Sequence, residues 1–116
     1  MRGEQWLKKS EQYARVHREG RSWVNRVVVM RALANGLAIS RYGFSVSRKV
    51  GKAVIRNRVR RRFREILRAK LIEPGWDIVF IARPIGETNY AGLNKAVTDL
   101  LTQAGLLKQI KSRSHG

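Results

Sequence analysis

The sequence predicts an α+β fold, a two-layer sandwich in which helices pack on one small mixed sheet in the order α-β-β-α-β-α. Two observations support this prediction. Three segments place apolar residues at helical spacing, and Val- and Ile-rich runs bounded by turn residues lie between them. A length of 116 residues, of which 43% are hydrophobic, suits a single domain with a buried core. We therefore expect one domain over 1–116, with flexible tails at about 1–6 and 109–116.

The first predicted element is a short helix that begins near Ser10. Serine is a favourable N-cap residue, and Gly20 is suited to end the helix. Within the helix, Tyr13, Val16 and His17 recur at spacings of three and four residues, so they share one face.

Two antiparallel strands are predicted to follow this helix. Residues 23–34 are rich in Val, and the dipeptide Asn35-Gly36 comes directly after them. Asn-Gly is the dipeptide that best tolerates the positive φ angles of a two-residue hairpin turn. Residues 37–47 then return as the second strand of the predicted hairpin.

A long helix is predicted over about 53–71, because five apolar residues fall within one arc of roughly 120°. These residues are Ile55, Val59, Phe63, Ile66 and Leu67. The other arginines of the segment spread over the remaining surface, but Arg56 falls within the apolar arc. Either the helix begins after Arg56, or its guanidinium reaches over the edge of the core toward a polar group.

The last two predicted elements are a central strand and a helix. Residues 76–83 form an apolar, β-rich run. After a loop over 84–88, Asn89 is suited to cap a helix that Gly105 ends.

The charge of the chain is concentrated in one region. The formal net charge is +17, and residues 41–70 contain 12 basic residues and one acid. Such a local excess indicates a polyanionic partner. A lipid surface is disfavoured, because the apolar arc of the helix in this region is needed for packing within the fold. No run of about 18 apolar residues occurs, so we expect no membrane-spanning helix. No apolar leader segment and no cysteine are present, and we expect a cytoplasmic protein.

The sequence also disfavours chemistry by the protein's own side chains. Seven residues, not four, separate Gly43 from Gly51, and Ala53 stands where a phosphate-binding loop needs Ser or Thr. No two of the eight acidic residues are closer than four positions, whereas two-metal cleavage of phosphodiesters needs clustered carboxylates. We therefore predict a binding protein with no catalytic residues and no direct metal ligands.

Two sets of residues are candidates for binding nucleic acid. The first is the arginine-rich helix, because the planar guanidinium forms paired hydrogen bonds to phosphate and remains charged. The second is Tyr13 and His17 with the neighbouring Arg15, because single strands bind to aromatic platforms in positive grooves. The alternative, that Tyr13 only packs on the sheet, stays open at this stage.

The run AVIRNR at 53–58, followed by Arg60-Arg61 and Arg64-Glu65, resembles the RNR signature of the bacterial ribonuclease P protein component family. The preceding run GFSVSRKVG at 43–51 is similar to the strand and loop that lead into that signature. The run DIVFIAR at 77–83 is similar to the family's third strand, and the resemblance extends from about Leu7 to Leu107.

The resemblance implies a fold with a left-handed βαβ crossover and a role as the accessory subunit of an endoribonuclease. In this family the protein joins one large catalytic RNA, which removes the 5′ leader from precursor tRNA by magnesium-dependent hydrolysis. The resemblance implies that the RNA carries the chemistry and holds most of the Mg²⁺, with one protein per RNA. It also implies that the catalytic RNA is bound by Arg48, Lys49, Lys52, Arg56, Asn57, Arg58, Arg60, Arg61, Arg64 and Arg68.

A second surface is implied for the single-stranded leader, in a cleft between the first helix and the sheet. Tyr13 matches an aromatic position of that cleft, and Arg15 lies beside it. His17 stands where an aromatic residue such as Phe is usual, and Arg31 stands where Tyr can occur. Stacking by His17 would be weaker than stacking by Phe.

Two other functions compete with this hypothesis. A structural RNA-binding protein, similar to a ribosomal protein, would have the same basic surface without a role in processing. A DNA-binding helix protein is disfavoured, because no helix–turn–helix pair occurs in the sequence.

Overall fold

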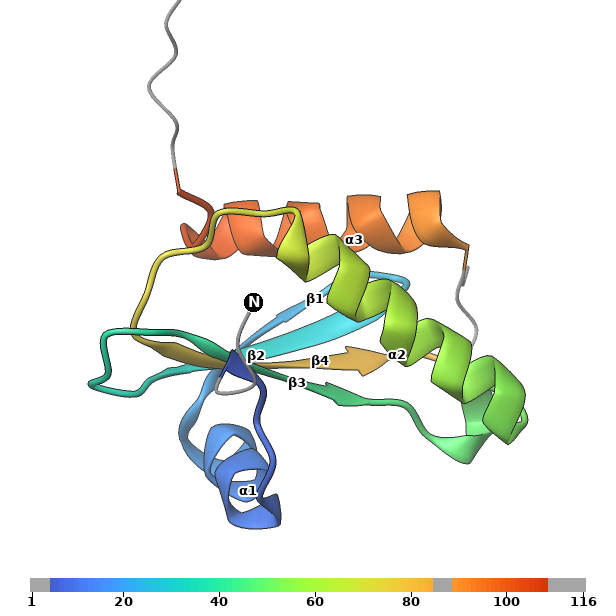
Figure 1. The fold of residues 1–116 in the computed structure, drawn as a ribbon, viewed down its shortest axis with the longest axis horizontal. Helices are drawn as coiled ribbons and strands as arrows, with labels where there is room; N and C mark the ends of the chain where they lie inside the picture. The colour runs from blue at the N-terminus through green and yellow to red at the C-terminus, as the bar shows by residue number, and fades with distance from the viewer. Residues whose placement is uncertain (1–4, 85–88, 109–116) are drawn as a thin grey trace, which may run out of the picture.

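The computed structural model describes residues 5–84 and 89–108, and it has the predicted α+β class. The elements are α1 (Ser10–Glu19), β1 (Arg21–Val24), β2 (Val28–Ala34), β3 (Arg41–Ser45), the 3₁₀ helix η2 (Arg48–Val50), α2 (Ala53–Arg68), β4 (Trp76–Ala82) and α3 (Tyr90–Ala104). One four-stranded sheet has the order β1-β2-β4-β3. In Figure 1, α1 lies below the sheet, and α2 and α3 lie above it. The described residues thus contain one strand more than the sequence predicts.

The extra strand arises because residues 21–34 form a hairpin, where the sequence predicts a single strand over 23–34. β1 and β2 pair antiparallel across a turn that Asn25 organises. The Asn25 side-chain oxygen accepts hydrogen bonds from the backbone N–H groups of Val27 at 3.0 Å and Val28 at 2.9 Å. Its amide also donates to the carbonyl oxygen of Ala96 in α3 at 3.1 Å. This turn ties the hairpin to the helix layer.

The hairpin predicted at Asn35-Gly36 is wrong, because β4 lies between β2 and β3. Gly36 does have a positive φ of 72°, as the dipeptide suggested, but it lies in a loop that carries the chain past β4. β4 is antiparallel to β2 and parallel to β3. An apolar strand such as β4 gains most from the centre of the sheet, where both of its faces and both of its edges are covered. That burial outweighs the local preference of a turn dipeptide.

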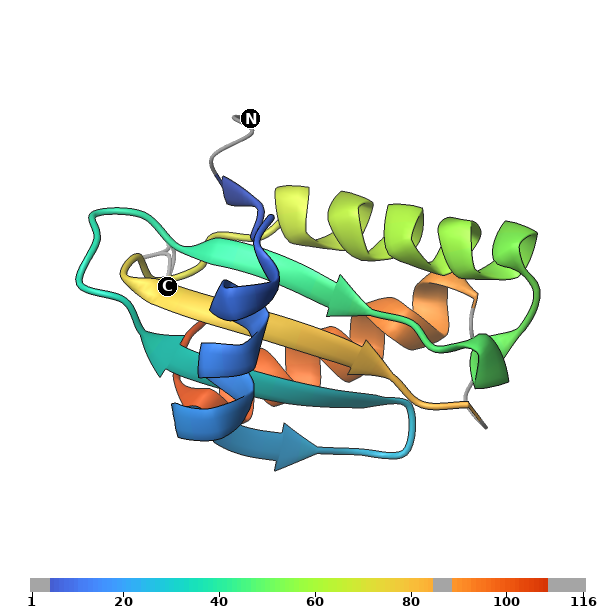
Figure 2. The same ribbon diagram turned by 90° about the horizontal axis from the view of Figure 1, so that it is seen from below.

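The unit β3–α2–β4 is a left-handed crossover, which is rare for parallel strands. Figure 2 shows β3 and β4 running in the same direction, with α1 in front of the sheet and α2 returning behind it. Viewed from the α2 side with both strands pointing upward, β4 lies to the left of β3. The handedness implied by the family resemblance is therefore present in this chain.

The core between the sheet and the upper helices is built around stacked aromatic rings. Phe63 of α2 lies 5.3 Å from the Phe44 ring of β3 and 6.0 Å from the Phe80 ring of β4, measured between ring centroids. Below the sheet, a smaller apolar cluster joins Val16 of α1 to Leu7 and to Val79 of β4. α1 is thus fixed to the opposite face of the sheet from α2.

The ends of the helices agree with the sequence in most places. Gly20 follows the end of α1, and Gly105 follows α3 with a positive φ of 73°. The Asn89 side chain caps α3 by accepting from the backbone N–H of Gly92 at 2.8 Å. The prediction that Ser10 is an N-cap is wrong, because Lys9 occupies that position and Ser10 is the first helical residue.

Two further predictions concern the length of α2 and the ends of the chain. α2 ends at Arg68, three residues earlier than predicted. Apart from Gln5 and Trp6, the predicted tails at about 1–6 and 109–116 lie outside the described residues, as does most of the predicted loop at 84–88. Trp6 packs against the core beside Tyr42. Within the described ranges, no helix is long and apolar enough to cross a membrane.

Candidate nucleic-acid interface

α2 separates its apolar and basic residues onto opposite sides. Val59, Phe63, Ile66 and Leu67 are buried against the sheet and α3. Because the helix is held by this side, most of its arginines are directed outward. We name the outward-facing cationic residues of α2 and its lead-in, together with the neutral Asn57 between them, the α2 basic face. Its members are Arg48, Lys49, Lys52, Arg56, Asn57, Arg58, Arg60, Arg61, Arg64 and Arg68.

The arginines of the α2 basic face have few internal partners. Arg60 donates to the side-chain oxygen of Asn57 at 3.0 Å. The guanidinium of Arg64 lies 5.8 Å from the centre of the Phe44 ring, and that of Arg68 lies 5.8 Å from the Trp6 ring. Arg58 is exposed. Among the described residues, none of these four arginines forms an ion pair, so their positive charge is available to an external anion.

The sequence left two alternatives for Arg56: the helix begins after it, or its guanidinium reaches a polar group. α2 begins at Ala53, so the helix does not begin after Arg56. Instead its side chain turns back, and its Nε donates to the carbonyl oxygen of Gly51 at 3.1 Å. The guanidinium is therefore held at the first turn of α2, next to the lead-in.

The lead-in is a 3₁₀ turn that places its cationic side chains in solvent. The Ser47 hydroxyl accepts a hydrogen bond from the backbone N–H of Lys49 at 3.3 Å. Arg48, Lys49 and Lys52 are all exposed. The structure thus brings the lead-in and α2 together at one end of the α2 basic face, although no periodic pattern joins them in sequence.

The second predicted set, which we name the α1 surface, lies on the other side of the sheet and consists of Tyr13, Arg15, His17 and Arg31. Tyr13 is half-buried and packs against the Leu7–Val16–Val79 cluster. Its ring lies directly over Gly43, where an added Cβ atom would come within 2.6 Å of the ring carbons. Glycine at this position therefore makes room for the aromatic ring.

The other three members of the α1 surface have different environments. Arg31 is half-buried, and its guanidinium donates to the carbonyl oxygens of His17 and Gly20, so it fastens the end of α1 to β2. His17 is exposed. Arg15 is also exposed and pairs with Glu19 at 3.7 Å. An exposed pair of this kind contributes little to stability, so Arg15 remains free to exchange partners.

Sequence reasoning missed a buried ionic network near the N-terminal ends of β3 and β4. Asp77 of β4 is only 3% exposed, and its carboxylate accepts two hydrogen bonds from Arg41 of β3, at 2.8 and 2.7 Å. The Asn35 amide donates to the same carboxylate at 2.9 Å. Burial by itself raises the pKa of Asp77, but these hydrogen bonds and the charges of Arg41 and Arg15 bring that pKa below its ordinary value. A lone acid within an apolar run was the signal that could have predicted such a partner.

A family model described as Ribonuclease P matches residues 1–105. The ribonuclease P protein component of Roseiflexus castenholzii is 44% identical over 106 residues, covering 88% of this chain and 87% of that protein. That of Dehalococcoides mccartyi is 42% identical over 109 residues, covering 93% and 91%. A solved structure of the Staphylococcus aureus RNase P protein superimposes with a TM-score of 0.81 at 29% identity, covering 90% of this chain and 98% of that one.

This chain belongs to the ribonuclease P protein component family. The resemblance inferred from the RNR run is confirmed. Membership in the ribonuclease P protein family assigns the chain to tRNA processing, as an RNA-binding component of a ribonucleoprotein.

The ribonuclease P protein family resemblance also implies magnesium, and the side chains can be tested for their fit to it. Magnesium prefers several oxygen ligands, usually carboxylates, in octahedral geometry. In the described part of this ribonuclease P protein, no three His, Asp or Glu side chains gather in one place. The most buried carboxylate, that of Asp77, is already bound by Arg41 and Asn35. The described side chains therefore do not fit a magnesium site.

Proposed function

We propose that the α2 basic face binds the catalytic RNA of ribonuclease P and that the α1 surface binds the 5′ leader of precursor tRNA. In this proposal the RNA performs the hydrolysis and holds the Mg²⁺, and one protein joins each RNA in the cytoplasm. The observation that carries the proposal is the α2 basic face, whose cations lie outward on a helix anchored by Val59, Phe63, Ile66 and Leu67.

The physical role of such a protein is electrostatic. A catalytic RNA and a precursor tRNA are both polyanions, and they repel each other most strongly when little magnesium is present. Cations of the α2 basic face reduce this repulsion, and contacts with about six phosphates would make RNA affinity fall roughly a thousandfold between 50 and 200 mM salt. A leader held on the α1 surface would restrict the motion of the scissile bond.

The position of the two surfaces fits a protein that lies between two RNA partners. α1 and α2 lie on opposite faces of the same sheet (Figure 1). A ribosomal-protein-like role would require only the α2 basic face. The half-buried Tyr13 ring over Gly43 favours a second binding surface, because the same short helix carries an aromatic ring and the exposed cation of Arg15.

The proposal is tested by reconstitution at low magnesium, where the RNA alone cleaves poorly. The full chain is mixed with a bacterial ribonuclease P RNA and a precursor tRNA, and release of the leader is measured. We expect the chain to stimulate cleavage. An absence of stimulation would contradict the proposal, and cleavage by the protein without RNA would contradict the assignment of chemistry to the RNA.

A variant series tests the leader surface. Tyr13→Ala should weaken binding of leader-bearing tRNA by the holoenzyme about tenfold and leave binding of mature tRNA nearly unchanged, because a stacked base contributes about 1–3 kcal/mol. Lys95→Ala is a suitable control variant, because Lys95 is exposed on α3 and pairs with Asp99 at 3.1 Å, away from both surfaces. An equal loss of affinity for leader-bearing and mature tRNA would show that Tyr13 only packs on the sheet.

A further inference from the structure

A cavity lies at the end of α2 that is farther from the lead-in, and of its lining residues only Arg68 belongs to a proposed surface. Its volume is about 300 Å³, and it lies between the segment before α1, β3, the end of α2, the loop from α2 to β4 and the segment after α3. The lining residues are Gln5, Trp6, Tyr42, Leu67, Arg68, Lys70, Leu71, Ile72 and Lys108. Two aromatic rings and three cations thus meet at one site, and none of these lining residues is acidic.

The aromatic part of the cavity is rigidly supported. The Trp6 and Tyr42 rings meet edge to face with centroids 5.9 Å apart, and Phe44 supports the indole at 5.8 Å. The backbone N–H of Leu7 donates to the carbonyl oxygen of Tyr42 at 2.8 Å, which holds the segment before α1 against β3. Neither ring therefore needs to be ordered when a ligand binds, which lowers the entropic cost of binding.

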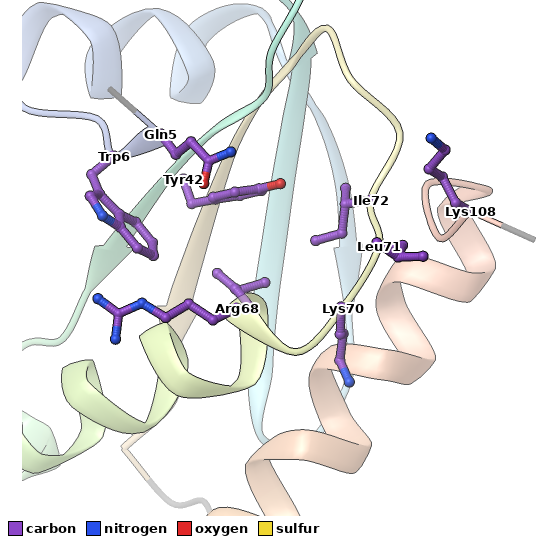
Figure 3. Close-up of a pocket in the computed structure, with 9 residues that line it drawn as sticks. Gln5, Trp6, Tyr42, Arg68, Lys70, Leu71, Ile72 and Lys108 are labelled. Atoms are coloured by element: carbon purple, nitrogen blue, oxygen red, sulfur yellow. The ribbon is translucent and has the colours of Figure 1, made fainter. Parts of the chain in front are cut away.

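The Tyr42 hydroxyl is available to a ligand. Figure 3 shows its oxygen directed across the cavity toward Ile72. Among the described residues it has no hydrogen-bond partner within the protein. Burial raises the pKa of Tyr42 to about 12, so the hydroxyl stays protonated near neutral pH and can donate a hydrogen bond to an anion or a base.

The three cations differ in how available they are to bind an anion. The Arg68 guanidinium lies over the Trp6 ring at 5.8 Å and is exposed. Lys70 is already used inside the protein, because its amino group donates to the Asn94 side chain at 2.8 Å. Lys108 is exposed at the other end of the cavity, as Figure 3 shows. An anion is therefore best received by Arg68, next to the aromatic rings.

We propose that this cavity binds one unpaired nucleotide of an RNA strand, with the base against the Tyr42 ring and a phosphate at Arg68. The volume of about 300 Å³ is at the lower end of the range for small-ligand sites, which suits a single nucleotide. Aromatic rings bind unstacked bases, and guanidinium binds phosphate with paired hydrogen bonds. Arg68 also belongs to the α2 basic face, so the choice of an RNA strand over a free nucleotide rests on the proposed function.

The test uses the full chain with ¹⁵N-labelled tryptophan, because the three indole N–H signals report on three places. Adenosine 5′-monophosphate and a single-stranded RNA of four nucleotides are titrated separately. We expect both to shift the Trp6 signal saturably, while the signals of Trp23 and Trp76 move little. Arg68→Ala should weaken the affinity for both ligands at least tenfold, because a hydrogen bond to a charged group is lost. Tyr42→Phe keeps the ring but removes the hydroxyl, and it should weaken both affinities two- to tenfold.

A matched control comes from a second cation–aromatic pair. Arg21 lies over the Trp23 ring at 5.5 Å on β1, so Arg21→Ala removes the same charge from the same kind of contact elsewhere. It should leave the Trp6 shifts unchanged. Equal movement of all three indoles, or equal weakening by Arg21→Ala and Arg68→Ala, would overturn the proposal as general electrostatic association.

The remaining outcomes separate the cavity from the proposed function. A Trp6 shift with the monophosphate but not with the RNA would overturn the assignment to an RNA strand. No Trp6 shift in a chain that stimulates leader removal would overturn the cavity alone. A Trp6 shift by RNA, weakened by Arg68→Ala, in a chain that fails to stimulate leader removal would support the cavity and contradict the proposed function.

Discussion

Gly43→Ala tests whether Tyr13 is placed by packing against β3 and also binds the leader. The added Cβ atom would lie 2.6 Å from two carbons of the Tyr13 ring, whereas ordinary contacts begin at 3.4 Å. The ring must therefore move by about 0.8 Å, or the strand must shift. Overpacking of this kind lowers the free energy of unfolding by about 1–3 kcal/mol. Because the end of a half-buried side chain can move, we expect a decrease of about 1 kcal/mol for Gly43→Ala.

A double-mutant cycle isolates this contact. In a Tyr13→Ala background the ring is absent, so Gly43→Ala should cost almost nothing, and the coupling between the two sites should be about 1 kcal/mol. The intrinsic effect of alanine on the strand backbone enters both backgrounds and cancels. The free energy of unfolding is measured by urea denaturation of all four proteins. Equal costs of Gly43→Ala in both backgrounds would refute the packing of Tyr13 on Gly43.

The same variant connects this packing to binding. A displaced ring should lose part of a stacking interaction worth about 1–3 kcal/mol, so Gly43→Ala should weaken the holoenzyme's binding of leader-bearing tRNA about fivefold without removing any charge. Mature tRNA is the control substrate. One outcome would show that Tyr13 packs on β3 but does not bind the leader. In that outcome the two substitutions are coupled by about 1 kcal/mol in the free energy of unfolding, and Gly43→Ala leaves the ratio of affinities for leader-bearing and mature tRNA unchanged.

Three further predictions concern charge, pH and the hairpin turn. Arg58→Ala should make the slope of log affinity for the catalytic RNA against log salt concentration shallower by about 0.7–0.9. Lys95→Ala should leave this slope unchanged. Equal slopes for the two variants would argue against a phosphate contact by Arg58. The folded pKa of Asp77 lies below the ordinary value of 3.8, so its contribution to stability is full above that pH and is lost as the pH falls through the folded value. Asp77→Asn should therefore flatten the acid side of the pH–stability curve measured by urea denaturation, and an unchanged acid side would contradict the network. Asn25→Ala should lower the free energy of unfolding by about 2–3 kcal/mol, because it removes three hydrogen bonds. Asn25→Asp keeps the acceptor oxygen and should lower this free energy by about half as much. A decrease below about 0.5 kcal/mol for Asn25→Ala would contradict the role of this turn.

The helices and the α2 basic face could be predicted well from sequence, because both depend on local periodicity. A helix repeats every 3.6 residues, so the spacing of Val59, Phe63, Ile66 and Leu67 alone determines which side is buried and where the arginines lie. The capping residue Asn89 and the terminating Gly105 act within a few residues of their own position. Such features need no knowledge of what packs against the helix.

Strand pairing could not be predicted in this way. The dipeptide Asn35-Gly36 correctly indicated a positive φ angle at the glycine, but its local preference does not choose the neighbouring strand. That choice depended on β4, more than 35 residues later in the chain, whose two edges are covered by β2 and β3. The energy of burying a central strand is a property of the whole sheet, so no window around the turn contains it.

The two candidate surfaces show the same division. By itself, the sequence determined the composition of the α2 basic face, and its RNR run pointed to the ribonuclease P protein component family. Only the tertiary structure placed the α1 surface on the opposite face of the sheet and brought Trp6, Tyr42 and Arg68 to one cavity. These residues meet because a left-handed crossover carries α2 over β3 and the segment before α1 pairs with β3. Contacts between residues far apart in sequence are selected by packing of the complete core, and packing has no local sequence signal.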